Sequence, residues 1–508
     1  MISRRAFMAQ GTALTALLAS SARAEMPRFL SDEPFNATTV EDLARDLAAK
    51  PHVPRAQAPA PWRNLSYDDY RKIRFQTRKS VWSETDLPLN MELFAPGQFF
   101  PQPIEVDVVK AGRAHRLAFD MALFDTSGLA TPLPVDETMG YSGLRLRADI
   151  LGSGIKQEFC VFQGASYFRA LANWQNYGLS ARGLALRTGD PEGEEFPDFT
   201  RFWIETPARN AESFTLHALL DSPSVTGAYR FEITPGTPLE MEVEVTLFAR
   251  QPLDHVGLAP LTSMFLFDQT NRDAYHDFRP AVHDSDGLLI WNGAGEMLWR
   301  PLANPVHLGV SSFVDTSPRG FGLIQRARRF EDFEDMEAQY HRRPSAWVEP
   351  RGDWGRGVVR LVEIPANKEI YDNIVAYWRP REPLQPGQAH RYAYRLSWGE
   401  EPLRRRNVAR VINTAMGLNF DQDQQLAVID YEDHPVLRGD LADLTVHVSS
   451  NNAKTSAGLL QRKTNTRGVR LAFSFDPGTR DTVELRAQLL RGGKAVSEVW
   501  LYRWSAPA

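Results

Sequence analysis

The stretch Met241–Phe248, MEVEVTLF, indicates the fold class because apolar and polar residues alternate along it. Met241, Val243, Val245 and Leu247 are separated by Glu and Thr residues. Successive side chains of a strand point to opposite faces, so this alternation is typical of a strand with one buried and one wet face. We predict a half-buried antiparallel strand here.

Similar runs recur from Met91 to Trp398, between Gly, Pro and Asp residues that favour turns. They do not alternate regularly with helical patterns, which argues against a parallel α/β fold. So long a β-rich region predicts a large sandwich rather than a small barrel. One helix is expected earlier, where Thr38 and Glu41 have the spacing of a capping box ahead of an amphipathic run.

The composition changes after these runs, and the basic triplet Arg404–Arg406 follows. We interpret residues 400–409 as an exposed linker. Strand patterns then resume, and Gly492-Gly493 predicts a hairpin turn. The sequence therefore predicts an all-β protein. It has a large N-terminal β-sandwich over residues 33–399 and a C-terminal immunoglobulin-like β-sandwich over residues 410–508.

The N-terminus has the three parts of an export signal in order. Ser3–Met8 reads SRRAFM with adjacent arginines, Ala13–Ala19 is a modest apolar run, and Ala22–Ala24 fits an A-x-A cleavage site. We predict a twin-arginine signal peptide over residues 1–24, cleaved after Ala24. The apolar run is shorter than the ~20 residues of a membrane span, so the mature protein is expected to be soluble in the periplasm.

The composition of the 508 residues, with 43% hydrophobic and 24% charged, is that of an ordinary globular protein. The net charge of −5 comes without a long block of one sign, so nucleic acid is not an expected partner. Cys160 is the only cysteine, which excludes an intramolecular disulfide and thiolate zinc sites. The many aromatic residues fit either a large core or a carbohydrate cleft.

The stretch Leu361–Trp378 holds the strongest candidate chemistry. Glu369 and Asp372 flank Tyr371 just before a predicted strand at Ile374–Trp378. Carboxylates among aromatics at the start of a strand suit sugar binding, and a solvated polar loop is the alternative interpretation.

Asp284 and Asp286 precede Gly287 in a segment rich in ionisable groups. The glycine comes too early for a calcium loop, so we expect an Asp-Gly turn into a strand and no metal site. The functional alternative places Asp284 in a cleft beside Asp372. Tyr340 and Arg343 are further candidates, because a phenol and a guanidinium can stack on sugars and hydrogen-bond to them. The sequence contains no phosphate-binding or dinucleotide motif, so no cofactor is expected.

Several long phrases of the sequence occur in one order: GASYFRAL (164–171), YGLSARGLAL (177–186), GEEFPDFTRFWIE (193–205), ALLDSPSVTGAYRF (218–231), LAPLTSMFLF (258–267), RPAVHDSDGL (279–288) and EIYDNIVAYW (369–378). Together they resemble the periplasmic glucan biosynthesis proteins OpgG and OpgD, also called MdoG and MdoD. The resemblance extends from about Asp32 to the C-terminus. The signal and the EIYDNIV wording favour the OpgD branch.

The resemblance implies a large sandwich of the galactose-mutarotase-like type. In hydrolytic members of the family the general acid lies in the D-N-I-V phrase, which is Asp372 here, and the base lies in the H-D-S phrase, which is Asp284 here. The base there acts through water molecules and a substrate hydroxyl. The same matching assigns sugar contacts to Glu369, Tyr340 and Arg343.

The resemblance also implies a role in making osmoregulated periplasmic glucans, with the β-1,2-glucan chain as partner. The expected activity is that of an inverting endo-glucanase or a transglycosylase. The alternative is a non-catalytic glucan-binding or assembly protein that controls the structure of the glucan backbone. A homodimer is left open.

Overall fold

The computed structural model describes residues 28–402, 407–464 and 466–506. The predicted export signal and the triplet Arg404–Arg406 lie outside these residues. Strands account for 46% and helices for 8%, so the predicted all-β class is confirmed, while the two named sandwich types stay predictions. Among the described residues, no helix is long and apolar enough to cross a membrane.

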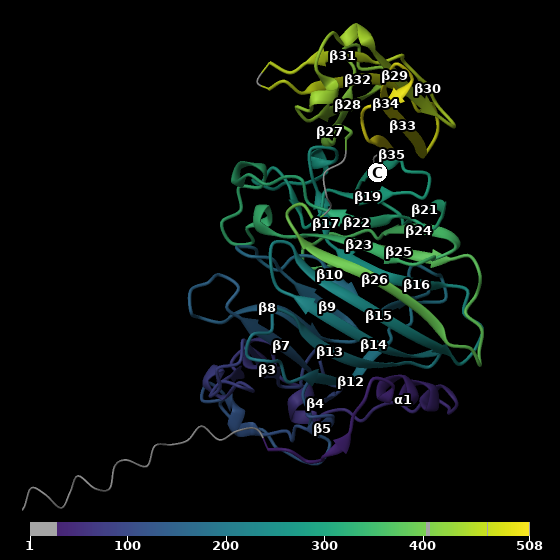
Figure 1. Ribbon diagram of the computed structural model, residues 1–508. Coiled ribbons are helices and arrows are strands. Elements are labelled where there is room, and N and C mark those ends of the chain that lie inside the picture. Colours follow the sequence, from purple (N-terminus) through teal and green to yellow (C-terminus); the bar gives the residue numbers. More distant parts are fainter. Residues whose placement is uncertain (1–27, 403–406, 465, 507–508) are drawn as a thin grey trace, which may run out of the picture.

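The largest sheet has 16 strands and extends from the N-terminal to the C-terminal end of the molecule (Figure 1). Its spatial order is β1 (Glu33–Pro34), β5 (Arg113–Arg116), β4 (Glu105–Lys110), β12 (Asp198–Glu205), β13 (Phe214–Asp221), β14 (Val225–Thr234), β15 (Leu239–Ala249), β26 (His390–Gly399), β23 (Ser345–Arg351), β22 (Gly320–Ile324), β19 (Gly287–Trp291), β20 (Met297–Pro301), β35 (Val499–Ser505), β33 (Thr482–Arg491) and β29 (Leu444–Ser450), with β34 (Lys494–Ala495) beside β33.

A second sheet has 10 strands. Its order is β21 (Gly309–Thr316), β24 (Arg356–Glu363), β25 (Ile374–Pro380), β16 (Val256–Ser263), β10 (Ser180–Arg182), β9 (Tyr167–Ala170), β8 (Gln157–Gln163), β7 (Gly143–Ala148) and β3 (Leu89–Phe94), with β11 (Leu184–Leu186) beside β16. Short pairs are formed by β17 (Phe265–Phe267) with β18 (Val282–His283) and by β2 (Arg74–Phe75) with β6 (Phe124–Asp125). The α-helices are α1 (Thr39–Ala48), α2 (Ala60–Arg63) and α3 (Tyr67–Tyr70).

The main core lies between the two large sheets. Phe162 and Phe168 of the smaller sheet each place their ring centroid 5.3 Å from that of Phe231 on β14, and Phe162 lies 5.5 Å from Phe202 on β12. Edge-to-face contacts of this kind add to the free energy gained by burying the rings. The two sheets are therefore joined by aromatic packing across their inner faces.

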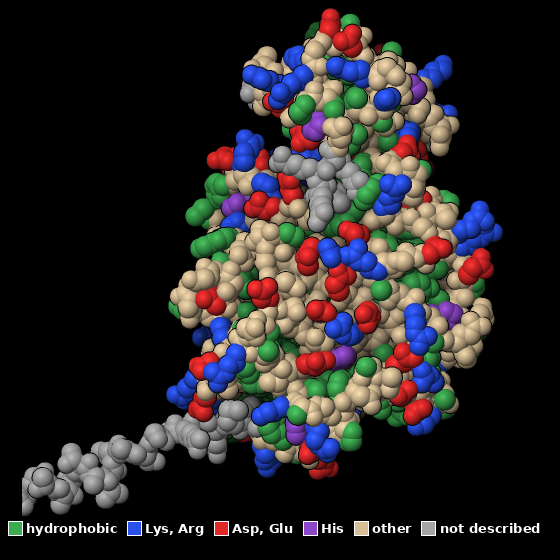
Figure 2. Space-filling view, viewed as in Figure 1, with side chains coloured by type: hydrophobic (Ala, Val, Ile, Leu, Met, Phe, Trp, Pro, Cys, Tyr) green, Lys and Arg blue, Asp and Glu red, His purple; other side chains and the backbone are tan. Residues whose placement is uncertain are grey.

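The predicted strand at Met241–Phe248 is confirmed as part of β15, which pairs antiparallel with β14 and β26. Its apolar side chains are buried and its Glu and Thr side chains face outward. Among the outward residues, Glu242 forms ion pairs with Arg351 and Arg395 of neighbouring strands. Figure 2 shows charges of both signs interspersed over one face of the molecule.

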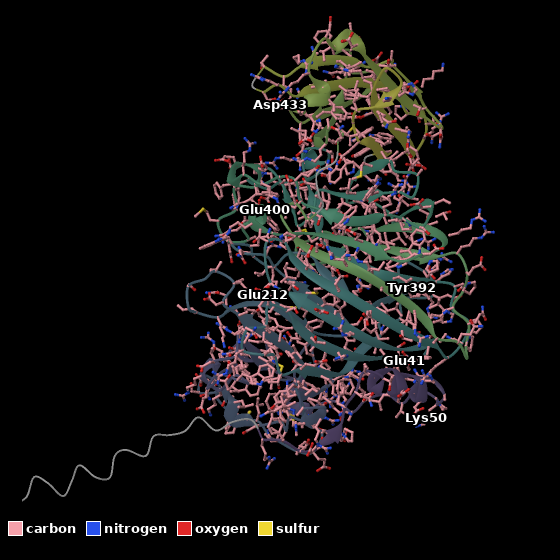
Figure 3. The ribbon with its side chains drawn as sticks, viewed as in Figure 1. Glu41, Lys50, Glu212, Tyr392, Glu400 and Asp433 are labelled. Atoms are coloured by element: carbon pink, nitrogen blue, oxygen red, sulfur yellow. The ribbon has the colours of Figure 1, made fainter. Side chains whose placement is uncertain are left out.

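Helix α1 forms where the sequence predicts a helix, but the predicted capping box is wrong. The Thr38 side chain makes no cap hydrogen bond, because the Thr38 backbone is helical, with φ of −97° and ψ of −9°, and lacks the extended dihedrals of an N-cap. The helix covers one end of the large sheet, where Glu41 binds Arg391 of β26 at 2.5 Å. Figure 3 places Glu41 on α1 next to the end of the strand that carries Tyr392.

The C-terminal strands form a lobe above the end of the large sheet (Figure 1). Its second layer is a five-stranded sheet of β27 (Val411–Leu418), β28 (Gln425–Tyr431), β32 (Val469–Asp476), β30 (Lys454–Thr455) and β31 (Leu459–Arg462). A core between the layers includes Phe473 and Trp500, with ring centroids 5.9 Å apart. The turn predicted at Gly492-Gly493 is confirmed between β33 and β34, with φ of 55° and 77°. Two layers are thus present, and the predicted boundaries at residues 399 and 410 stay predictions.

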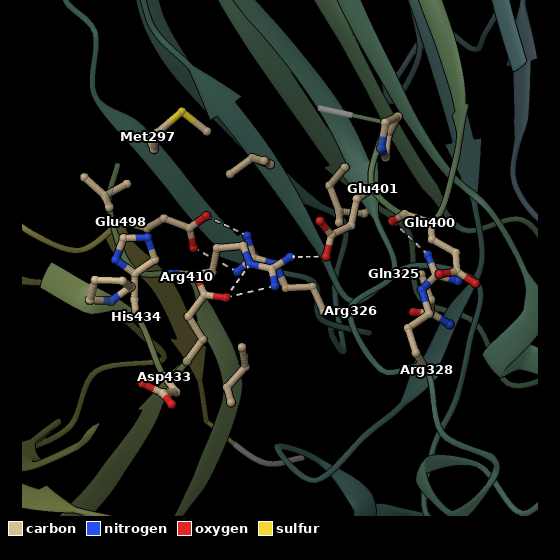
Figure 4. A pocket seen from close by; sticks show the side chains of 17 residues that line it. Met297, Gln325, Arg326, Arg328, Glu400, Glu401, Arg410, Asp433, His434 and Glu498 are labelled. Carbon is tan, nitrogen blue, oxygen red and sulfur yellow. Dashed lines mark hydrogen bonds and ion pairs between the residues drawn. The ribbon is translucent and has the colours of Figure 1, made fainter. Parts of the chain in front are cut away.

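The large sheet continues from the N-terminal region into this lobe, because β20 pairs in parallel with β35. At this junction the buried side chains of Arg326 and Glu498 form an ion pair at 2.7 Å (Figure 4). The Arg326 guanidinium lies 3.5 Å from the centroid of the Trp299 ring. Glu498 also accepts a hydrogen bond from the backbone of Val411. A buried charge pair with further hydrogen bonds therefore joins the two regions.

We predict that Glu498→Gln lowers the free energy of unfolding by about 3–5 kcal/mol, because a buried guanidinium loses its carboxylate. Urea denaturation followed by tryptophan fluorescence measures this. The matched control is Glu296→Gln, which removes the exposed pair between Glu296 and Arg486 across the same junction, at 3.1 Å. That change should cost about 1 kcal/mol or less. Equal effects of the two substitutions would contradict the prediction.

Candidate active site

Asp372 lies in the turn that enters β25, as the sequence predicts. Its side chain is 31% exposed, and its nearest charged partner is Arg169 of β9, whose Nη2 lies 3.5 Å from Oδ2. Arg169 is held in turn by its Nε, which donates to the Ser180 hydroxyl at 2.9 Å. Asp372 is therefore open to solvent on one side and faces a guanidinium on the other.

Asp284 follows β18 and is buried, with 3% exposure. Its carboxylate forms a short ion pair with Arg343, whose guanidinium lies 4.2 Å from the centroid of the Tyr340 ring. Burial raises the pKa of Asp284, the Arg343 charge opposes this rise, and the charge of Asp372 adds to it. The buried carboxylate of Asp284 thus depends chiefly on the Arg343 guanidinium to compensate its negative charge.

The turn Tyr340–Arg342 and the residue after it, Arg343, supply two of the predicted sugar contacts, Tyr340 and Arg343. Tyr340 is only 2% exposed, and its pKa is raised, chiefly by burial. Gly178 lies against this turn: a Cβ there would come within 2.9 Å of the Cβ of Arg343. Glycine at position 178 therefore allows the loop that precedes β10 to approach the Arg343 side chain.

Glu369 is half-exposed and lies 2.7 Å from Arg279, which also pairs with Asp335 and Asp277. The contact with Arg279 is an ion pair by distance, although Glu369 Oε2 lacks a hydrogen bond of good geometry. The charges of Glu369 and Asp284 both act on Tyr340. The structure thus gathers the predicted residues into one neighbourhood, with Asp284 and Arg343 in direct contact and Glu369 held at its edge.

Asp372 lines a groove of about 590 Å³. Its lining includes Phe99, Phe100, Gln163, Tyr167, Arg169 and Asp372. The Phe99 side chain is 72% exposed. The face of Tyr167 rests on the buried guanidinium of Arg182, 4.7 Å from the ring centroid, and burial raises the pKa of Tyr167 to about 12. Apolar rings beside polar groups offer both surfaces that a sugar presents.

A second cavity of about 500 Å³ lies at the junction with the C-terminal lobe (Figure 4). Its charged lining is arranged in ion pairs, in which Arg326 binds Glu498 and Arg410 binds Glu432 and Glu401. The predicted site residues do not line it. We take the groove as the candidate active site because Asp372 lines it, whereas Asp284, Glu369, Tyr340 and Arg343 line neither the groove nor the junction cavity.

The stretch ending in Gly287 does not form a calcium loop. Asp286 instead accepts hydrogen bonds from the backbone amides of Arg326 and Ala327. Within residues 28–402, 407–464 and 466–506, no group of three or more His, Cys, Asp or Glu side chains is placed to hold a metal ion.

Sequence reasoning missed Arg169, Tyr167 and Arg279. Arg169 and Tyr167 stand in the phrase GASYFRAL, and Arg279 opens RPAVHDSDGL, yet neither phrase has the spacing of a known catalytic motif. Each residue reaches the site only because strands distant in sequence are paired side by side. Local spacing therefore contained no signal for them.

The profile of the family described as "Periplasmic glucan biosynthesis protein, MdoG" matches residues 35–504. Glucans biosynthesis protein G 1 of Shewanella oneidensis is 47% identical over 493 residues, which cover 96% of this chain and 90% of the relative. Glucans biosynthesis protein G of Shewanella frigidimarina is 47% identical over 483 residues, covering 94% and 86%. These relatives have the name of the G branch, so they do not support the preference for the OpgD branch.

Among solved structures, a chain described as a polysaccharide lyase aligns with 72% of this chain and 45% of its own length. The sequence identity is 12% and the TM-score is 0.19. A likeness this weak supports no conclusion about fold or chemistry.

We predict that Arg343→Met moves the titration of the Asp284 carboxyl to higher pH. The guanidinium favours the charged form of Asp284, so its loss leaves burial to raise the pKa further. Carbon-13 NMR of protein labelled at aspartate carboxyls measures the midpoint. Arg279→Met, which removes the partner of Glu369, is the matched control and should leave the Asp284 midpoint in place. A midpoint that is the same in all three proteins would refute the assignment.

Proposed function

Since the chain belongs to the MdoG family of periplasmic glucan biosynthesis proteins, we propose that it cleaves the β-1,2-glucan backbone as an inverting endo-glucanase. The observation that supports this most directly is the asymmetry of the two acids. Asp372 is partly exposed and lines a groove that has aromatic walls, whereas Asp284 is buried and paired with Arg343. Glycoside hydrolysis requires one carboxyl that donates a proton and one carboxylate that accepts a proton.

In this proposal Asp372 starts protonated and gives its proton to the glycosidic oxygen as the bond from that oxygen to the anomeric carbon breaks. Water attacks the anomeric carbon from the opposite face, which inverts its configuration. The proton released by that water passes to Asp284, through water molecules and a substrate hydroxyl as the family resemblance implies. Asp372 ends charged and Asp284 ends neutral, and exchange with solvent restores both.

Glu369, Tyr340 and Arg343 hold the glucan chain in this proposal. Arg343 has a second task, because its charge opposes the rise in the Asp284 pKa that burial causes and so favours the charged form, which can accept a proton. Tyr340 supports Arg343 through the stacked guanidinium and reaches substrate over a small exposed part of its side chain. The proposal also includes export by the twin-arginine route with cleavage after Ala24.

Two other functions use the same groove. A transglycosylase would admit a glucan hydroxyl in place of water, and a binding or assembly protein would hold glucan without breaking bonds. Incubation of the purified protein with linear β-1,2-glucan separates the three when reducing ends and product lengths are followed together. Hydrolysis increases reducing ends, transfer changes chain lengths without that increase, and binding changes neither.

We predict that Asp372→Asn and Asp284→Asn each lower kcat on linear β-1,2-glucan by about 10²–10⁴-fold, because each removes one proton transfer. Reducing-end release measures the rates. Asp286→Asn is the matched control, since Asp286 belongs to the same turn as Asp284 but binds backbone amides. Cleavage by Asp372→Asn at the wild-type rate would rule out the assigned acid.

We predict that Phe99→Ala weakens the binding of β-1,2-gluco-oligosaccharides by about three- to tenfold, because the groove loses an aromatic face on which a sugar can stack. Isothermal titration calorimetry with an Asp372→Asn background prevents cleavage during the measurement. Phe278→Ala, which removes a ring that is 76% exposed and does not line the groove, is the control. Equal affinities in all three proteins would place the glucan elsewhere.

A further inference from the structure

Asn373 lies next to Asp372 and is buried, with 1% exposure. Its side-chain oxygen accepts a hydrogen bond from the backbone N–H of Phe265 at 2.8 Å. Its side-chain nitrogen donates to the carbonyls of Phe265, at 2.9 Å, and Ile364, at 3.0 Å. One side-chain amide is therefore hydrogen-bonded to two neighbouring segments at the point where β25 begins.

These bonds continue the sheet by one residue. Ile374 is the first residue of β25 and pairs with Ser263 on one side and Glu363 on the other. A primary amide has the donors and acceptor of a peptide group, so the Asn373 side chain can take the place of the next backbone pair. It does so toward Phe265; toward Ile364 the side-chain bond adds to a backbone bond, in which the Ile364 N–H donates to the Asn373 carbonyl at 2.8 Å.

The segment of Met264 and Phe265, to which the Asn373 side chain is hydrogen-bonded, also pairs with the segment that contains Asp284, the second acid. The backbone N–H of Asp284 donates to the carbonyl of Met264 at 2.8 Å, and His283 pairs with Phe265 in the small β17–β18 sheet. Met264 and Phe265 therefore connect the backbone of Asp284 to the residue beside Asp372. All of these residues except Asp372 are buried.

We propose that Asn373 is a positioning residue that sets the separation between the carboxyl groups of Asp284 and Asp372. The inference rests on the proposed function, since the separation of two acids matters where they act on one bond. That separation decides how the attacking water is accommodated in glycoside cleavage. A displacement of about 1 Å in such a site can cost about 10²-fold in rate.

Asn304 offers a matched control. Its amide also bonds to β17, at the carbonyl of Leu266, and to the backbone of Ala366, which follows Ile364 in the loop before β25. It contacts neither Phe265 nor Ile364 through a hydrogen bond within the part of the chain that the structure describes. Asn304→Ser thus removes a half-buried amide that bonds to the same two segments at other residues and leaves the hydrogen bonds of Asn373 in place.

The kinetic test compares Asn373→Ser and Asn304→Ser on linear β-1,2-glucan. We expect kcat of Asn373→Ser to fall by about 10- to 100-fold, with KM within about threefold of wild type, because binding residues are retained. Asn304→Ser should keep kcat within about threefold at a similar loss of thermal stability. Equal losses of kcat in the two variants, or an unchanged kcat in Asn373→Ser, would overturn the proposal.

A second measurement does not depend on activity. Amide hydrogen exchange should quicken at Phe265 and Asp284 in Asn373→Ser and stay as in wild type in Asn304→Ser. Unchanged exchange at both amides would overturn the proposal even if activity falls. A wild-type protein that leaves the glucan intact would remove the proposed function, and the exchange comparison would still decide whether Asn373 holds the two segments together.

Asn373→Asp covers the case in which the serine variant fails to fold. It keeps the acceptor for the Phe265 N–H and loses the donors to Phe265 and Ile364. We expect faster exchange at Asp284, because the carboxylate repels the carbonyls of Phe265 and Ile364 and loosens the segment, and a loss of kcat of the same order as for Asn373→Ser. Wild-type exchange and wild-type kcat in this variant would overturn the proposal.

Discussion

The ion pair between Asp284 and Arg343 is the interaction on which the candidate site depends. A carboxylate with 3% exposure can stay charged only if a partner compensates for lost hydration, and Arg343 is that partner. The pair in turn requires its surroundings. Tyr340 supports the guanidinium from one side, and the absence of a side chain at Gly178 lets Arg343 lie where it does. The tight packing around Arg343 is thus a consequence of burying a charge.

The strands that adjoin the two acids explain why the acids differ. Asp372 stands at the start of β25, an interior strand of the smaller sheet, where the groove keeps it in contact with solvent. Asp284 is buried and lies directly after the short strand β18. Strand ends that meet at one place can present one acid to a ligand and hold another acid in the interior. A small shift of either strand end would change both environments at once.

The sequence predicts the strands well because their side chains face either core or solvent. Along β15 this appears as an alternation of apolar and polar residues. It also predicts Asp372 at the start of a strand. It does not predict Arg169 or Arg279, because their roles arise from pairing between segments far apart in the chain. The Thr38 capping box fails for a local reason: the Thr38 backbone is already helical, whereas a capping side chain needs the extended dihedrals of an N-cap.

The continuous sheet changes how the C-terminal lobe relates to the site. Arg328 is buried among backbone carbonyls, and it donates to that of Arg343 near the site and to that of Glu400 at the start of the junction. Ser345 bonds to the same guanidinium and to the same Glu400 carbonyl. Arg343 compensates the charge of Asp284. The backbone carbonyl of Arg343 is bonded to Arg328, so the junction helps to fix the position of the Arg343 guanidinium. The lobe therefore cannot be treated as an independent attachment, because the chain that enters it is bonded to the turn that holds the buried acid.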